Sequence, residues 1–117
     1  MQEISPDELV QFCRCTGFTM KMARLELKEM EPKLRSRVLL AAQVGKSDDE
    51  MLRDPIEADE VFGKLIEEAA AKAEKNVAYD GLGACQMIWA EQARILKEEH
   101  AIDWSSPAQM NPWVMMD

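Results

Sequence analysis

The chain has 117 residues, of which 47% are hydrophobic and 31% are charged, and it contains five Gly and five Pro. This length and composition predict a single folded domain that buries its own core, and they exclude an intrinsically disordered chain. The formal net charge of −8 argues against generic binding to nucleic acid or to an anionic membrane, because such binding requires a concentrated basic surface.

The charges are unevenly distributed along the chain. Residues 1–46 hold eight Lys or Arg and six Asp or Glu, whereas residues 47–117 hold six and sixteen. We therefore expect one helical domain, residues 1–117, with a mildly basic half over 1–46 and an acidic half over 47–117.

Helix starts are marked by a capping residue followed three positions later by Glu or Gln. The two side chains accept hydrogen bonds from amide groups that the first helical turn leaves without partners. The pattern occurs four times, as SPDE at Ser5, SDDE at Ser47, DPIE at Asp54 and SPAQ at Ser106. Each occurrence predicts a helix N-terminus.

These caps, the glycines and the apolar periodicity predict five longer helices, over residues 6–15, 19–31, 32–44, 55–77 and 84–100. Residues 18–30 leave an alternative open, because good helix formers favour a helix whereas the alternation in FTMKM and LEL is typical of a strand. The fold class is therefore all-α, a bundle of about five short to medium helices with an apolar C-terminal tail packing across it.

The apolar periodicity also predicts which helix faces are buried. In the first helix Leu9, Val10 and Cys13 fall within one arc, and in the helix over 55–77 the apolar half includes Val61. In the last long helix Gln92 lies at the centre of an apolar face. Such a residue fixes the register of paired helices in an oligomer or hydrogen-bonds a backbone group, and the sequence leaves both interpretations open.

The tail from residue 104, WSSPAQMNPWVMMD, has no charge until its final Asp. It carries two tryptophans and three methionines, Trp104, Met110, Trp113, Met115 and Met116. If exposed, they would form an apolar patch of several hundred Å², about the largest that a soluble monomer tolerates. We expect the tail to be covered by its own helices, with cover by another chain as the alternative.

No catalytic or metal-binding pattern is evident. Cys13 and Cys15 are two residues apart, so on a helix their thiols point about 200° apart and do not meet one metal ion, which makes a thiol or metal module the least favoured hypothesis. The chain has a single histidine, His100, and its adjacent acid pairs do not converge. We expect no enzyme activity and no cofactor.

A helix, a break at Gly17 and a second helix outline a degenerate helix-turn-helix over about residues 8–30. Lys21, Arg24 and Lys28 share one face of the second helix and would contact DNA in this alternative. Ala23 and Glu26 occupy positions where such motifs usually carry larger apolar residues.

The favoured hypothesis is a non-catalytic, acidic protein-binding protein: an inhibitor, adaptor or assembly factor. Its acidic helix face, with Glu60, Glu67 and Glu74, would attract a basic partner. Residues Trp104, Met110, Trp113, Met115 and Met116 would supply the apolar anchor. The partner is another protein or a second copy in a homodimer, with no membrane, and the absence of a secretory leader predicts a cytoplasmic location.

Overall fold

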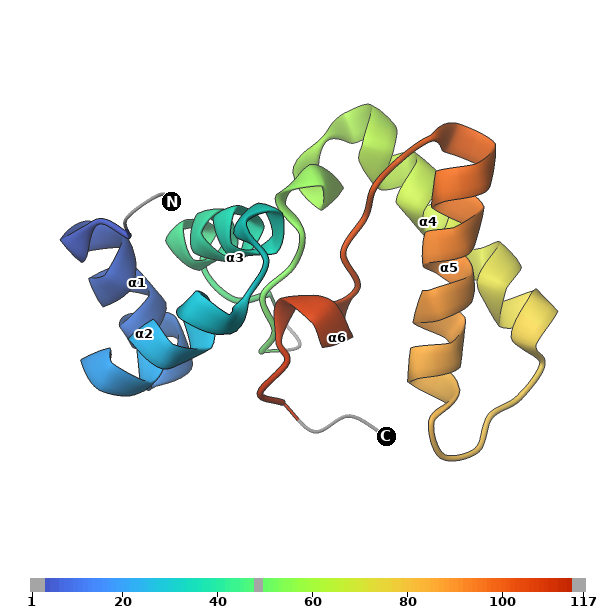
Figure 1. The fold of residues 1–117 in the computed structure, drawn as a ribbon. Helices are drawn as coiled ribbons and strands as arrows, with labels where there is room; N and C mark the ends of the chain where they lie inside the picture. Colours follow the sequence, from blue (N-terminus) through green and yellow to red (C-terminus); the bar gives the residue numbers. More distant parts are fainter. Residues whose placement is uncertain (1–3, 48–49, 115–117) are drawn as a thin grey trace. The chain divides into compact units, whose positions relative to one another are not determined.

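The computed structural model describes residues 4–47 and 50–114, which contain helices and no strand (Figure 1). The elements are α1 (Pro6–Thr16), α2 (Met20–Glu29), α3 (Pro32–Val44), the 3-10 turn η1 (Pro55–Ala58), α4 (Glu60–Val77), α5 (Ala84–His100) and α6 (Pro107–Met110). The predicted all-α class is confirmed. The chain divides into two compact units, Met1–Arg53 and Asp54–Asp117.

The first unit begins with α1, whose start is encoded by Ser5. The hydroxyl of Ser5 accepts a hydrogen bond from the Glu8 amide at 3.2 Å, and the Glu8 carboxylate accepts one from the Ser5 amide at 3.1 Å. The helix stops at Gly17, whose φ of 80° lies in the left-handed region that glycine adopts without steric cost. The predicted boundaries of this helix are therefore set by local chemistry.

Residues 20–29 form a helix, α2, rather than a strand. Thr19 caps it by accepting a hydrogen bond from the Met22 amide at 3.2 Å. Ala23 and Leu27 are buried, whereas Met22 and Leu25 are 47% and 51% exposed. The strand-like alternation in the sequence arises because α2 carries apolar side chains on its exposed face as well as on its buried face.

Arg35 of α3 caps the C-terminal end of α2. Its Nε donates to the Leu27 carbonyl at 2.7 Å, and its Nη2 donates to the Met30 carbonyl at 3.0 Å. Carbonyl groups at a helix end lack intrahelical partners, and a cation there also interacts favourably with the helix dipole. This contact joins α2 to α3 across the short connection between them.

The buried face of α1 differs from the predicted one. Phe12 is fully buried and its ring meets that of Phe18 edge-on, with centroids 6.0 Å apart, whereas Val10 is 38% exposed. Leu9 is buried as expected. The buried arc is thus centred between Leu9 and Phe12, because the larger Phe side chain packs against Phe18, and the predicted inclusion of Val10 is wrong.

Two of the four predicted helix starts, Ser47 and Asp54, do not begin an α-helix, and Ser106 begins only the four-residue α6. Residues 50–53 are not helical, and the Ser47 hydroxyl donates to the Met51 carbonyl at 2.9 Å. Asp54 begins only η1. The start of α4 is instead Asp59, whose Oδ1 accepts from the amides of Val61 and Phe62 at 2.9 and 3.0 Å.

Gly63 allows η1 to pack against the first turn of α4. A β-carbon at this position would lie 2.8 Å from the Glu57 carbonyl oxygen, closer than non-bonded atoms approach. The turn over 55–58 therefore folds back on the helix that follows it, instead of continuing into it as the sequence pattern predicted.

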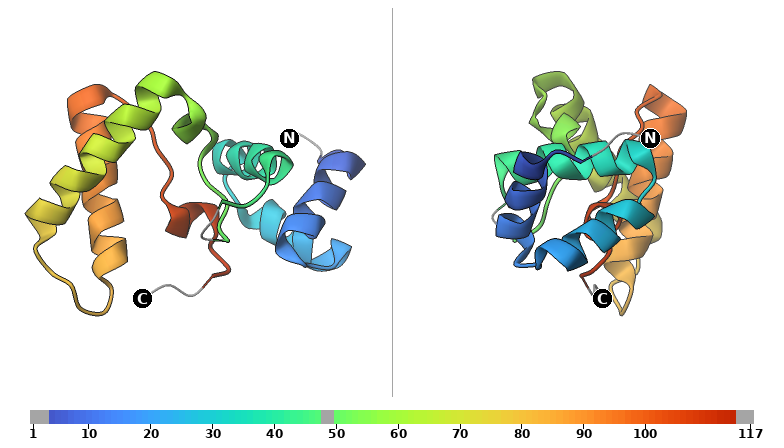
Figure 2. Two further views of the ribbon diagram at one scale, coloured as in Figure 1. Left: turned by 180° about the vertical axis from the view of Figure 1, so that it is seen from behind. Right: turned by 60° about the vertical axis from the view of Figure 1, so that its left-hand side comes forward.

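The second unit is built on an antiparallel pair, α4 and α5, which lie side by side (Figure 2). Its core contains Ile66, Ala69, Ala73, Ile95, Leu96, Ile102 and Trp104. Gln92 is buried among them, and its Nε2 donates to the Ile66 carbonyl at 3.0 Å. Of the two interpretations of Gln92, the structure shows the backbone hydrogen bond.

The segment after α5 closes the second unit. Trp104 is only 5% exposed, and its indole Nε1 donates to the Glu57 carboxylate at 3.0 Å. The amide of Ser105 donates to the Asp54 carboxylate at 2.8 Å, and Asp54 is itself buried. Ser106 then caps α6 through a reciprocal pair of hydrogen bonds with Gln109.

The two tryptophans of the tail should differ in their effect on stability. Replacing Trp104 with Ala removes a core side chain and its hydrogen bond to Glu57, so we expect the free energy of unfolding to fall by about 3 to 5 kcal/mol. Trp113 is less completely buried, and Trp113→Ala should cost less than half as much. Urea titrations of the two variants measure this, and equal losses would contradict the assignment of Trp104 to the core.

Candidate functional site

Three glutamates form a row along α4. Glu60, Glu67 and Glu74 are all exposed and are spaced seven residues apart, which is about 10.5 Å or two helical turns. We call this row the acidic flank. None of the three forms an ion pair within the part of the chain that the structure describes. The sequence predicted these residues, and the helix brings them onto one side.

The acidic flank faces away from the ion pairs that link α4 to α5. Lys72 Nζ contacts Glu99 Oε1 at 2.8 Å, and Asn76 Nδ2 donates to Glu91 Oε2 at 2.8 Å. On a helical wheel at 100° per residue, Lys72 and Asn76 lie on the side of α4 opposite Glu67. The carboxylates that stabilise the helix pair are therefore distinct from those of the acidic flank.

The formal net charge of the chain belongs to the second unit. Residues 1–53 hold nine Lys or Arg and nine Asp or Glu, whereas residues 54–117 hold five and thirteen. The division between the units falls seven residues after the sequence boundary at 46, so the acidic residues 48–50 belong to the first unit. The first unit therefore has no formal net charge, and the second unit carries the whole net charge of −8.

The exposed face of α5 carries a three-residue charge network. Arg94 contacts Glu91 at 2.6 Å and also pairs with Glu98. Hydrogen bonds from Arg94 and Asn76 lower the pKa of Glu91 to about 2. The hydrogen bonds that Arg94 donates to Glu91 and Glu98 raise the pKa of Arg94. The hydrogen bond from Lys72 lowers the pKa of Glu99. Glu91, Arg94 and Glu99 therefore stay charged through the neutral range.

The predicted apolar anchor lies largely inside the protein. Trp104 and Met110 are buried, Trp113 is half-buried, and Met115 and Met116 lie outside the described residues. The side chains of Trp104 and Met110 are therefore removed from any exposed docking surface.

The helix pair exposes apolar side chains that the sequence had placed inside. Val61 was predicted on the buried half of its helix, but it is 67% exposed. The buried arc of α4 is centred on Ile66, Ala69 and Ala73, and Val61 lies more than a quarter turn from it. The predicted apolar half of the helix was too wide, because it extended from the buried arc to Val61 at its edge.

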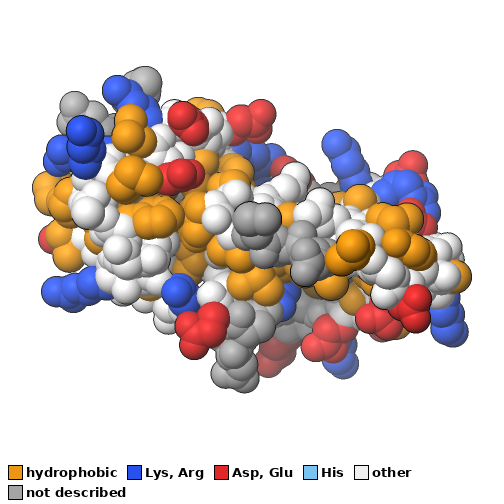
Figure 3. Space-filling view, turned by 90° about the horizontal axis from the view of Figure 1, so that it is seen from below, with side chains coloured by type: hydrophobic (Ala, Val, Ile, Leu, Met, Phe, Trp, Pro, Cys, Tyr) orange, Lys and Arg blue, Asp and Glu red, His pale blue; other side chains and the backbone are white. Residues whose placement is uncertain are grey.

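The exposed face of α2 combines basic and apolar side chains. Lys21, Arg24 and Lys28 are all exposed, as the sequence predicted, and Leu25 lies between Lys21 and Lys28 on the same face. Over the first unit, hydrophobic surface lies beside Lys and Arg side chains (Figure 3). The three cations were predictable from the sequence, whereas the exposure of Leu25 between them was not predicted.

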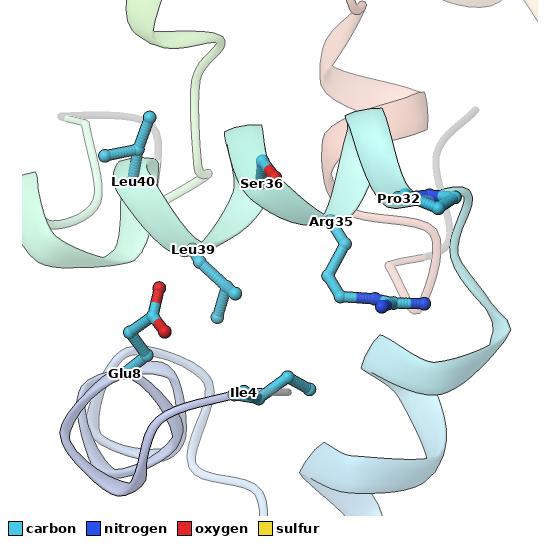
Figure 4. Close-up of a pocket in the computed structure, with 7 residues that line it drawn as sticks. All are labelled: Ile4, Glu8, Pro32, Arg35, Ser36, Leu39 and Leu40. Carbon is cyan, nitrogen blue, oxygen red and sulfur yellow. The ribbon is translucent and has the colours of Figure 1, made fainter. Parts of the chain in front are cut away.

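A pocket of about 200 Å³ lies in the first unit, lined by Ile4, Glu8, Pro32, Arg35, Ser36, Leu39 and Leu40. Leu39 points from α3 toward α1, and the guanidinium of Arg35 is directed toward the end of α2 (Figure 4). Glu8 and Arg35, the two charged groups here, already cap α1 and α2. Their hydrogen bonds serve the fold, so the pocket offers no free acid or base for chemistry.

A second hollow, of about 170 Å³, lies between α5 and α6 and is lined by Gln86, Trp89, Ala90, Ala93, Ser106, Ala108 and Gln109. Ser106 and Gln109 bond each other in the cap of α6. The walls are therefore an indole, three alanine side chains, a serine hydroxyl and two amide side chains, with no titratable group.

The cysteines lie apart. The thiol of Cys13 meets the sulfur of Met20 at 3.6 Å, the thiol of Cys15 donates to the Ala42 carbonyl at 3.1 Å, and Cys85 is exposed. Among residues 4–47 and 50–114, no group of three His, Cys, Asp or Glu side chains is arranged to hold a metal ion. No helix in these ranges is long and apolar enough to cross a membrane.

The chain was compared with protein families, curated proteins and solved structures. No protein-family model, no curated protein and no solved structure matches the chain.

The network on α5 should make stability depend on pH in the acid range. Because the pKa of Glu91 is lowered to about 2 in the folded protein, its contribution is fully present above pH 4.5 and is lost as the pH falls toward 2. The melting temperature of Glu91→Gln should therefore lie below that of the parent at neutral pH, and the difference should shrink on acidification. The contribution is small because the pair is exposed.

Thermal melts between pH 7 and pH 2 at low ionic strength test this expectation. Glu68→Gln serves as the control, since Glu68 forms no ion pair within the described residues. A constant difference between parent and Glu91→Gln at every pH would show that the ion pair does not act through the charge of Glu91.

Proposed function

We propose that this chain is a non-catalytic protein-binding protein that recognises a basic partner through the acidic flank of α4. The observation that carries the proposal is the row of Glu60, Glu67 and Glu74 on one exposed side of a long helix, in the unit that holds the whole net charge. A row of like charges supported by an acidic unit attracts a basic surface and orients it along the helix.

The spacing within the row favours a helical partner. Neighbouring glutamates are about 10.5 Å apart, close to the Debye length of about 10 Å at 0.1 M salt, so each carboxylate acts nearly independently and pairs best with its own cation. Ala71 is exposed between Glu67 and Glu74 and leaves room for an apolar side chain of the partner. The contact is thus electrostatic at its edges and apolar at its centre.

The proposal extends to the absence of catalysis and of a cofactor. The charged groups of the larger pocket are engaged as helix caps, which supports a binding role over acid–base chemistry. An inhibitor, an adaptor or an assembly factor would all work through such a surface. We place the protein in the cytoplasm, since its three cysteines are free thiols, which persist in a reducing compartment.

A synthetic helical peptide with lysines seven residues apart and a leucine between them is the probe for this function. At 0.1 M salt the labelled peptide should bind the parent protein, and Glu67→Lys combined with Glu74→Lys should weaken binding about tenfold, as expected for the loss of two exposed ion pairs and their replacement by repulsion. Fluorescence anisotropy measures the dissociation constants.

The matched control combines Glu68→Lys with Asp80→Lys, which changes the net charge equally but leaves the acidic flank intact. This variant should bind within about twofold of the parent, since net charge alone acts weakly at this ionic strength. If both double variants lose binding equally, or if 1 M salt leaves binding unchanged, recognition through the acidic flank is wrong.

A DNA-binding regulator is the second candidate, and one observation favours it. α1, the break at Gly17 and α2 form a helix-turn-helix outline, with Lys21, Arg24 and Lys28 exposed on α2. The balanced charge of the first unit weighs against it, because DNA-binding domains are usually basic.

This candidate makes its own prediction. If α2 reads DNA, a gel shift with duplex DNA at low salt should appear with the parent and disappear when Lys21, Arg24 and Lys28 are changed to Glu, since each lost phosphate contact weakens binding. Our proposal expects no shift with either protein. A salt-dependent shift with the parent alone would favour the regulator.

A further inference from the structure

We infer that the partner of the acidic flank is a second copy of this chain, which docks its α2 on α4. The inference rests on the proposed function and names the occupant of the same surface. It follows from a match between two exposed rows of the protein, one basic and one acidic, that carry the same spacing.

The two rows have identical spacing and opposite charge. On α2 the exposed residues Lys21, Leu25 and Lys28 occupy positions one, five and eight of a two-turn row. On α4 the exposed residues Glu67, Ala71 and Glu74 occupy the same positions. Residues with this spacing lie on one face of a helix.

Placed side by side in parallel, the rows complement each other at every position. Seven residues span about 10.5 Å in both helices, so Lys21 lies opposite Glu67 when Lys28 lies opposite Glu74. Leu25 then faces Ala71. The small side chain of Ala71 allows the two helix axes to approach to roughly 8–10 Å, the distance typical of packed helices, and at this distance Leu25 is covered. The apolar centre between two ion pairs also fixes the register of the contact.

The exposed leucine is the feature that a purely electrostatic surface leaves unexplained. Leu25 is 51% exposed at the centre of a helix whose other exposed side chains include three cations. Burying it gains hydrophobic free energy that solvent-exposed lysines alone do not supply. Met22, also exposed on α2, extends the apolar area beside it.

Several other cations in the protein are already engaged. Lys72 pairs with Glu99, Arg94 pairs with Glu91, and Arg35 caps α2. Lys21 and Lys28 form no ion pair within the described residues, and neither do Glu67 and Glu74. The basic row and the acidic row are therefore both available to a second copy.

The contact is small, and this sets the kind of association. A two-turn helix row buries less than the roughly 1,200 Å² of a stable interface, so the complex is weak and exchanges rapidly. The contact is also heterologous, since α2 of one copy meets α4 of another. It forms either a closed dimer in which it occurs twice or a longer assembly.

Sedimentation equilibrium at 0.1 M and 1 M salt tests the inference with complementary variants. One variant carries Lys21→Glu and Lys28→Glu, and the other carries Glu67→Lys and Glu74→Lys. The parent should show an average mass that rises with concentration at 0.1 M salt and not at 1 M. Each variant alone should associate at least about tenfold more weakly, because like charges now face each other.

The mixture of the two variants is the decisive sample. In the mixture the acidic α2 of one variant meets the basic α4 of the other, and the reverse contact is complementary too, so association should return to near the parent level. All four substitutions in one chain should restore it as well. A control with Arg14→Glu and Lys46→Glu, which changes the charge equally outside both rows, should associate like the parent.

Failure of this inference is distinguishable from failure of the proposed function. If the parent stays monomeric at 0.1 M salt but binds the lysine peptide through Glu67 and Glu74, the acidic flank serves a foreign protein and the second copy is excluded. If the parent binds neither itself nor the peptide, the proposed function is wrong as well. A mixture that fails to associate, with each variant showing unchanged helical circular dichroism, overturns the pairing of α2 with α4.

Discussion

The buried carboxylate of Asp54 ties the start of the second unit to the segment that follows α5, and this link closes the unit over the core of the helix pair. One oxygen accepts the Ile56 amide at the start of η1, and the other accepts the Ser105 amide, 51 residues later in the chain. A buried carboxylate is stabilised by such charge-assisted hydrogen bonds, and losing them would leave an uncompensated charge. Trp104, next to Ser105, is thereby held in the core beside the helix pair.

This closure decides which surfaces remain for function. Because the segment after α5 is bonded to the start of the unit, Trp104 fills the interior, whereas Trp113 is only half-buried. Glu60, Glu67 and Glu74 form their row on an exposed side of α4, away from its buried residues Ile66, Ala69 and Ala73. The acidic flank is consequently carried by a helix that is packed along its length and presents its charges at fixed intervals.

The features predictable from sequence are those encoded within about four residues. Ser5 and Ser106 cap their helices, and Gly17 ends α1, through bonds to neighbouring residues. The row of Glu60, Glu67 and Glu74 was predictable for the same reason, since helical spacing alone defines it. Ser47 and Asp54 carry the same cap pattern, yet neither starts a long helix, because their side chains bond Met51 and Ser105. The burial of Trp104 depends on Glu57, 47 residues away, and no local pattern contains it.

The distribution of charge explains why a contact between copies would rest on short-range pairs. Each copy carries a net charge of −8, all of it in the second unit, so two copies repel each other at long range. At an ionic strength near 0.1 M the Debye length of about 10 Å screens much of this repulsion between distant charges, while Lys and Glu in direct contact are screened less. Very low salt restores the repulsion, and high salt weakens the pairs. Leu25, the apolar residue at the centre of the basic row, adds a hydrophobic attraction that salt does not screen. This attraction would allow the basic row of one copy to bind the acidic row of another despite the overall repulsion.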